Sequence, residues 1–172
     1  PAGNLGNISA IGKALRQAYQ IGLINHMPRF AAIQAEGANP FYRSYMTKFA
    51  DRFSLQPDTV ATAIKIGNPV SHKRARRVIE ETDGVVASVN DAQILAAKAV
   101  IDRSGIGCEP ASAATLAGIR QLVEAGVIER GERVVGILTG TLLKDTKTGI
   151  PQGSDSVVIQ PTIEAVRSVL AG

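Results

Sequence analysis

Short apolar segments alternate along this chain with segments of helical polarity, and this alternation constrains the fold more than any other sequence feature. The clearest unit begins at residues 85–89, an apolar and largely β-branched run. Asn90 and Gln93 follow with the spacing of a capping box, and Gly105 lies where a helix reaching Ser104 would end. Alternation of this kind predicts an α/β fold with three αβα layers and a mostly parallel sheet.

The same pattern predicts the other elements. Helices are expected at 8–21 between Asn7 and Gly22, at 40–49 after Asn39, at 71–81 between Ser71 and Gly84, at 110–125 and at 162–170. Strands are expected at 30–34, 60–66, 134–138 and 157–159, with the continuous apolar run 134–138 in a central position. Small residues at 111, 114, 117 and 118 predict a closely packed helix, and 146–156 has the composition of a linker. The sequence shows no internal repeat and no low-complexity stretch, which indicates one domain.

Composition limits the classes of protein to which the chain can belong. It has 172 residues, 45% of them hydrophobic, a formal net charge of +4 and one cysteine. A chain of this length can bury a core without disulfides, and its cysteine content is typical of a reducing compartment, so we expect a cytoplasmic protein. A membrane span would need a run of about 18 apolar residues, and the sequence has no such run. We therefore expect no membrane partner.

The charged and metal-ligating residues have structural interpretations. The basic run 72–77 precedes Glu80 and Glu81 at helical ion-pair spacing, so we interpret it as a solvated helix face and expect no nucleic-acid partner. Two histidines and one cysteine, without a paired-ligand motif, indicate no metal site. Cys108 lies beside Glu109, which would raise the pKa of its thiol, and it is interpreted as a buried structural residue.

The first candidate site is the opening segment, in which Gly3, Asn4, Gly6 and Asn7 come directly before a predicted helix. Glycines at this place let successive backbone N–H groups converge on an anion at the positive end of the helix dipole. The segment has neither a Walker sequence nor the full glycine spacing of a dinucleotide fingerprint. From the residues alone, a phosphate cradle and a tight turn with an asparagine cap remain equally open.

Two further candidates carry polar side chains at the ends of predicted elements. Thr139 follows the predicted strand 134–138, at the edge where open α/β sheets bind ligands, although a simple turn at the strand end is the alternative. Glu109 and Ser112 lie at the start of the small-residue helix, where a carboxylate is also favourable for electrostatic reasons alone. None of these candidates decides the function separately.

Taken in order, the motifs resemble the threonine synthases, which are fold-type-II pyridoxal-phosphate (PLP) enzymes. The resemblance runs through GNLGN at 3–7, QAEGANP at 34–40, KIGNPVS at 65–71, EETDGVV at 80–86, CEPASAA at 108–114 and LTGTLLKD at 138–145. It implies a fold like that of the tryptophan synthase β subunit. It also implies that residues 1–172 are a C-terminal portion of such an enzyme, mainly its large PLP-binding domain.

The resemblance assigns roles to particular residues. It implies that Gly3, Asn4, Leu5, Gly6 and Asn7 hold the PLP phosphate. Thr139 would contact the pyridine nitrogen, and Glu109 would lie near the ring. A neutral hydroxyl at that nitrogen does not favour ring protonation as a carboxylate would.

Position within the predicted fold adds substrate candidates. Asn7 is a candidate for the substrate phosphate, and Asn68 and Ser71 are candidates for the lining of the substrate crevice. Capping remains the alternative for Asn7 and Ser71.

The sequence departs from the family in two places. The loop after Thr139 reads Thr139-Gly140-Thr141-Leu142, where the family more often has Thr-Gly-His-Gly, so it must form without the second glycine. The family's Schiff-base lysine lies in a Ser-Phe-Lys-Asp-like motif upstream of the phosphate loop, and no segment here matches it. We therefore expect this lysine in a missing N-terminal part of the enzyme, and we expect the present chain to be inactive alone.

The implied activity is that of a PLP-dependent carbon–oxygen lyase. It converts O-phospho-L-homoserine and water to L-threonine and phosphate, and we expect the full enzyme to be a homodimer. Other fold-type-II activities, such as those of threonine dehydratase or a cysteine synthase, are the nearest alternatives. A non-catalytic module that binds a phosphorylated metabolite or a polyanion is the alternative from another class.

Overall fold

A computed structural model describes residues 1–145 and 158–170, and its centre is a parallel sheet of two strands. Strand β1 (Ala31–Ala35) pairs with β2 (Val85–Val89) from Ala31 opposite Val85 to Ala35 opposite Val89. Both strands are built from small and β-branched apolar residues together with Gln34 and Ser88. Strands of this composition suit a parallel sheet that is covered on both faces.

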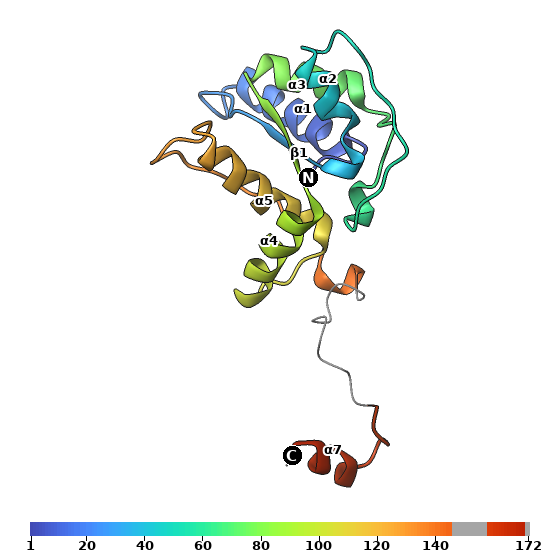
Figure 1. The fold of residues 1–172 in the computed structure, drawn as a ribbon. Coiled ribbons are helices and arrows are strands. Elements are labelled where there is room, and N and C mark those ends of the chain that lie inside the picture. The colour runs from blue at the N-terminus through green and yellow to red at the C-terminus, as the bar shows by residue number, and fades with distance from the viewer. Residues whose placement is uncertain (146–157, 171–172) are drawn as a thin grey trace.

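Helices cover both faces of the sheet (Figure 1). On one face, Ile33, Ala35, Ala87 and Val89 share a core cluster with α4 (Asp91–Arg103) and α5 (Pro110–Glu124). On the other face, Ala32 and Val86 share a second cluster with α1 (Gly6–Gln20), α2 (Pro40–Met46) and α3 (His72–Glu81). The alternation of strand side chains between the two clusters confirms the predicted three-layer α/β architecture.

The segment from β2 through α4 to α5 has the predicted local structure. The backbone N–H of Gln93 donates to Asn90 Oδ1 at 2.9 Å, and the N–H of Asn90 donates to Gln93 Oε1 at 2.8 Å, which completes the capping box of α4. Gly105 adopts a φ of 83° after the helix. Gly118 of α5 lies so close to β1 that a Cβ there would be 2.4 Å from side-chain carbons of Ile33. The predicted close packing of the small-residue helix is therefore confirmed.

Two predicted strands are wrong. Residues 60–66 contain the short 3₁₀ helix η2 (Thr62–Ile64), because the Asp91 carboxylate accepts hydrogen bonds from Thr59 Oγ1 and from the N–H of Val60. These bonds fasten the segment to the start of α4 instead of extending it along the sheet. Residues 134–138 form no strand either, and they follow α5, where Thr115 Oγ1 donates to the Ile137 carbonyl at 3.0 Å.

Three predicted side-chain caps are also wrong. Helix α1 begins one residue earlier than Asn7, and the residue before it is Leu5, whose side chain cannot cap. The Ser71 side chain makes no capping bond to α3. Asn39 instead donates from Nδ2 to Ser88 Oγ and accepts from Arg43 Nε, so its amide joins α2 to the sheet.

The remaining elements are short. They are the 3₁₀ helices η1 (Glu36–Ala38) and η3 (Leu142–Lys144) and the helix α7 (Ile163–Leu170), which matches the helix predicted at 162–170. Residues 158 and 159 are not in a strand, and the predicted linker at 146–156 lies outside the described residues together with Val157. Within 1–145 and 158–170, no helix has the length and apolar character needed to cross a bilayer.

Candidate functional site

Two carbonyl groups of the loop at residues 3–7 are hydrogen-bonded to other parts of the protein. The Ala2 carbonyl just before it accepts from Gln34 Nε2 at 2.9 Å. Within the loop, the Asn4 carbonyl accepts from the N–H of Ser71, and the Leu5 carbonyl accepts from both the N–H and the hydroxyl of Ser9. The carbonyls of Asn4 and Leu5 are therefore already occupied on the protein side.

The backbone N–H groups of the same loop, unlike these two carbonyls, are not hydrogen-bonded within the described residues. Across the part of the chain that the structure describes, no acceptor is found for the N–H groups of residues 3–7. Leu5 adopts the left-handed conformation, with φ 64° and ψ 14°, immediately before α1 begins at Gly6. Successive N–H groups in such a turn form a concave site for an anion, and the positive end of the helix dipole adds to it. The loop therefore presents N–H groups without acceptors among the described residues, which is the arrangement that an anion site requires.

Two glycines show where this loop is tight and where it is open. A Cβ on Gly3 would lie 2.8 Å from the Cα of Ile64, so only glycine fits against η2 at this position. A Cβ on Gly6 would meet no heavy atom within 4 Å. The space in front of Gly6, at the first turn of α1, is therefore free for a ligand.

A second loop, residues 67–71, is held against the first. Asn4 Oδ1 accepts from the N–H of Val70 at 2.8 Å. Arg52 Nη2 donates to Asn68 Oδ1 at 2.9 Å, which fixes the other end of this loop. Two of the substrate candidates, Asn68 and Ser71, therefore lie in a loop that contacts the loop at 3–7, and the third, Asn7, is exposed in the first turn of α1.

The third part of the site is the start of α5, which holds residues 139 and 140. Ser112 is completely buried, and its Oγ accepts from the N–H of Thr139 at 2.8 Å and from the N–H of Gly140 at 2.7 Å. The Oγ atoms of Ser112 and Thr139 are 3.1 Å apart, and Thr139 itself is exposed. The predicted site residue Thr139 is therefore fixed by a serine to which the sequence had assigned no partner.

Glu109 lies next to the same segment. Its N–H donates to the Gly140 carbonyl at 3.1 Å, and its side chain packs so closely that a Cβ on Gly140 would be 2.1 Å from Oε1. Glu109 is 8% exposed, and Cys108 forms an isolated antiparallel bridge with Thr141. Burial, followed by the negative charge of Asp102, raises the pKa of the Cys108 thiol, which agrees with a structural cysteine.

Contacts between elements connect the loop at 3–7 with the start of α5. Gly3 packs on Ile64 of η2, and Ile64 belongs to the same core cluster as Ala111 and Ala113 of α5. In Figure 1 the N-terminus and the first turn of α5 both lie near the carboxyl ends of the strands, the edge at which open α/β sheets bind ligands. Sequence reasoning predicted this edge, although it placed Thr139 on a strand that does not form.

Gln34 is a supporting residue of the candidate site that sequence reasoning missed. It is fully buried, and while its Nε2 donates to Ala2, its Oε1 accepts from the N–H groups of Phe41 and Tyr42 at 2.9 Å each. It therefore fastens residue 2, just before the loop at 3–7, and the start of α2 to the same strand. A glutamine within a buried apolar strand was the available signal, because a buried amide requires partners.

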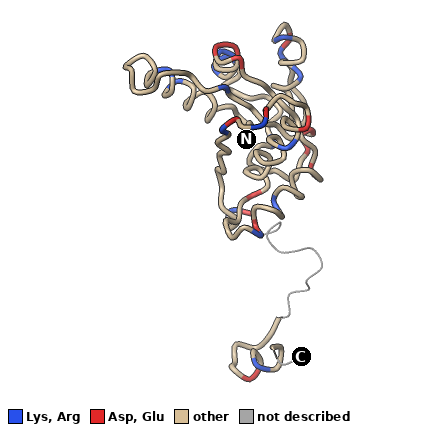
Figure 2. The backbone as a smooth tube through the Cα atoms, turned by 90° about the vertical axis from the view of Figure 1, so that its left-hand side faces the viewer, with Lys and Arg blue, Asp and Glu red and all other residues tan. Residues whose placement is uncertain are grey.

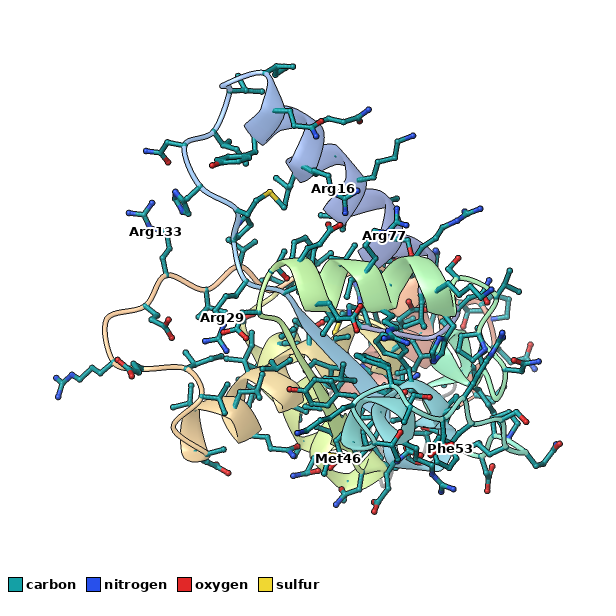
Figure 3. The ribbon with its side chains drawn as sticks, turned by 90° about the horizontal axis from the view of Figure 1, so that it is seen from above. Arg16, Arg29, Met46, Phe53, Arg77 and Arg133 are labelled. Atoms are coloured by element: carbon teal, nitrogen blue, oxygen red, sulfur yellow. The ribbon has the colours of Figure 1, made fainter. Side chains whose placement is uncertain are left out.

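Arg76 is the arginine of the basic run of α3 that makes contacts within the protein, whereas Lys73, Arg74 and Arg77 are exposed. Arg76 pairs with Glu80 at 2.8 Å and donates to the Phe49 carbonyl, and Arg16 of α1 pairs with Glu81. Arg16 and Arg77 project from the neighbouring helices α1 and α3 in Figure 3. Acidic and basic residues are interspersed along the backbone in Figure 2.

Within the described residues, no group of three or more metal-ligating side chains is found.

Comparison with known proteins decides the family. Residues 1–140 match the family model described as pyridoxal-phosphate dependent enzyme. The chain belongs to the pyridoxal-phosphate dependent enzyme family. This confirms the family resemblance of the sequence motifs.

Relatives within this family narrow the comparison. The threonine synthase of Methanosarcina acetivorans is 45% identical over 174 aligned residues, which cover 100% of this chain and 43% of that protein. The threonine synthase of Methanocaldococcus jannaschii is 38% identical, over 99% of this chain and 42% of that protein. The chain thus spans less than half the length of these relatives.

A solved structure has a similar fold. The crystal structure of a threonine deaminase superposes with a TM-score of 0.53 at 21% identity, over 74% of this chain and 43% of that one. At this level of identity the likeness concerns the fold alone. It supports the three-layer arrangement of the described residues.

Proposed function

We propose that residues 1–172 belong to a threonine synthase, in which they form a C-terminal portion that is mainly the PLP-binding domain. In this proposal the enzyme converts O-phospho-L-homoserine and water to L-threonine and phosphate. The observation that carries the proposal is the loop at 3–7, whose N–H groups have no acceptor among the described residues while the Asn4 and Leu5 carbonyls are bonded toward the protein. The similarity to threonine synthases over the whole chain supports the choice of reaction.

The loop residues fit the phosphate of PLP. Gly3, Asn4, Leu5, Gly6 and Asn7 would present backbone N–H groups to a dianion, and the dipole of α1 favours negative charge at that point. Gly6 leaves the approach open, whereas Gly3 lets the loop sit directly against η2. The phosphate would then be held by backbone groups alone, without the need for a lysine or arginine.

Thr139 is proposed as the partner of the ring nitrogen, and Glu109 as part of the wall beside the ring. The Thr139 hydroxyl is neutral, so it can meet the nitrogen without drawing a proton onto it. The buried Glu109 side chain lies against Gly140, the residue after Thr139, which keeps this edge of the site closely packed. When bound, PLP supplies an electron sink for bond breaking at the substrate.

The substrate would lie between the two loops. Asn7, Asn68 and Ser71 are proposed to line this side, because the loop at 67–71 is held against residue 4. The base that removes protons is proposed to be a Schiff-base lysine in an N-terminal part of the full-length enzyme. Two lysines of this chain, Lys98 and Lys65, are instead paired with Asp102 and Asp58.

A substitution of Gly6 tests the phosphate site. In the full-length protein, Gly6→Ala places a methyl group in open space, so it touches no protein atom but obstructs a phosphate at the first turn. Loss of a hydrogen bond to a charged group costs about 1.5–3 kcal/mol, so PLP affinity measured by absorbance titration should fall roughly 10- to 100-fold. The melting temperature without PLP should not fall, because alanine is the better helix former.

A matched control separates obstruction from a general effect on α1. Ala10→Val adds a larger group at an exposed position of the same helix, and it should leave PLP affinity unchanged. Equal affinity for PLP in the Gly6→Ala variant and the parent protein would remove the proposed phosphate site. Strong, salt-dependent binding of short DNA without PLP binding would favour the polyanion-binding alternative instead.

A further inference from the structure

The Ser112 hydroxyl sits in a set of hydrogen bonds that fixes how it can use its single proton. Its Oγ accepts from two successive backbone N–H groups, those of Thr139 at 2.8 Å and Gly140 at 2.7 Å. A hydroxyl oxygen has two lone pairs, and both are engaged by these donors. Ser112 is completely buried, so it has no access to solvent. It can therefore act toward any other neighbour only as a donor.

Two acceptors lie within reach of that proton. Thr139 Oγ1 is 3.1 Å from Ser112 Oγ, and the Gly140 carbonyl oxygen is 3.3 Å away. The Gly140 carbonyl already accepts from the N–H of Glu109. Thr139 Oγ1 is the nearer of the two, and the described hydrogen bonds give it no other partner.

This arrangement determines what Thr139 can do with its own proton. Because both lone pairs of Ser112 are in use, Thr139 cannot donate to Ser112. Its hydroxyl proton must therefore point away from Ser112 Oγ, and Thr139 is exposed. A hydroxyl that accepts one hydrogen bond also becomes a stronger donor in the next one.

We propose that Ser112 is a positioning residue that presents the Thr139 hydroxyl as a hydrogen-bond donor to the pyridine nitrogen of PLP. This inference rests on the proposed function, which places the ring nitrogen at Thr139. Ser112 acts in two ways: it holds the backbone of residues 139 and 140, and it directs the Thr139 proton outward. The ring nitrogen is then the acceptor, so the site selects the ring in its unprotonated form.

The test is a spectroscopic measurement on the full-length protein loaded with PLP labelled with ¹⁵N in the ring. Ser112→Ala removes the acceptor of two N–H groups and the donor to Thr139. We expect the ring ¹⁵N resonance to move and PLP to bind at least about tenfold more weakly. A tenfold loss of affinity corresponds to about 1.4 kcal/mol. Thr139→Ser should keep the parent resonance, because it retains the hydroxyl.

Thr115→Val is the matched control. Thr115 lies one turn further along α5 and donates to the Ile137 carbonyl at 3.0 Å, so it holds the same segment by a hydroxyl without touching Thr139. A purely structural role for Ser112 would make Ser112→Ala and Thr115→Val equivalent. The inference requires that Thr115→Val leave the ring resonance in place, and equal shifts in the two variants would overturn it.

Two more measurements keep the test decisive. Thr139→Val separates the proposals: if it leaves the resonance and the PLP affinity unchanged, Thr139 is not the ring partner and the proposed function loses that contact. If Thr139→Val moves the resonance and Ser112→Ala does not, only the role of Ser112 fails. Should Ser112→Ala not fold, the unmodified protein decides, because a ring resonance in the protonated range near neutral pH would contradict the inference.

Discussion

At the scale of single residues, the candidate site depends on which backbone groups are already bonded. The glycines and asparagines at 3–7 predicted an anion loop from the sequence, and their position before a helix was correct to within two residues. The left-handed conformation of Leu5 could not be predicted, because leucine has no local preference for it. The bridging role of Gln34 also depends on residues 2, 41 and 42, which become neighbours only in the fold.

His72 carries a prediction about pH. Its ring lies against Phe41, with Nε2 3.2 Å from Ser44 Oγ, and burial, followed by the positive charges of Arg52 and Arg76, lowers its pKa. Below about pH 6.5 the unfolded chain gains a proton at this histidine that the folded chain does not yet bind. The free energy of unfolding should therefore fall as pH drops below that value, until the folded-state pKa is passed.

The measurement is urea unfolding between pH 5 and 8 for the parent and for His72→Gln, which cannot titrate at this position. Above the unfolded-state pKa the two free-energy curves should be parallel, and below it the parent should lose stability more steeply. Parallel curves over the whole range would show that His72 is not the group responsible.

At the scale of elements, prediction succeeded where the signals are local. The capping box at Asn90, the strand 85–89 and the proline at the start of α5 all depend on neighbours in sequence. It failed at 60–66, where Asp91, about thirty residues away, bonds to Thr59 and Val60. It failed again at 134–138, whose apolar run lies beside α5 and pairs with no strand among residues 1–145 and 158–170.

The capping box gives a quantitative prediction for α4. Asn90→Ala removes the acceptor for the N–H of Gln93 and should lower the free energy of unfolding by about 1 kcal/mol. In thermal unfolding this corresponds to a drop in melting temperature of roughly 2–4 °C. Asn90→Asp keeps the acceptor oxygen and should stay close to the parent. Equal losses in the two variants would mean that the cap does not stabilise the helix.

At the scale of the whole molecule, the three layers could be predicted from the alternation of elements, but the extent of the sheet could not. Among the strands predicted within the described residues, the sheet contains only those at 30–34 and 85–89. Strand pairing requires partners that a local sequence pattern does not specify. Apolar side chains remain exposed outside it, among them Val135 at 82% and Leu143 at 83%. This exposure fits the proposal that the rest of a longer enzyme covers these side chains.

The central claim is that the loop at 3–7 binds the phosphate of PLP while Thr139 meets its ring nitrogen. The most direct measurement is a crystal structure of the full-length protein with PLP bound. We predict phosphate oxygens within hydrogen-bonding distance of the backbone N–H groups of residues 3–7, and the ring nitrogen within that distance of Thr139 Oγ1. A phosphate held elsewhere, or a ring nitrogen that meets another side chain, would contradict the account.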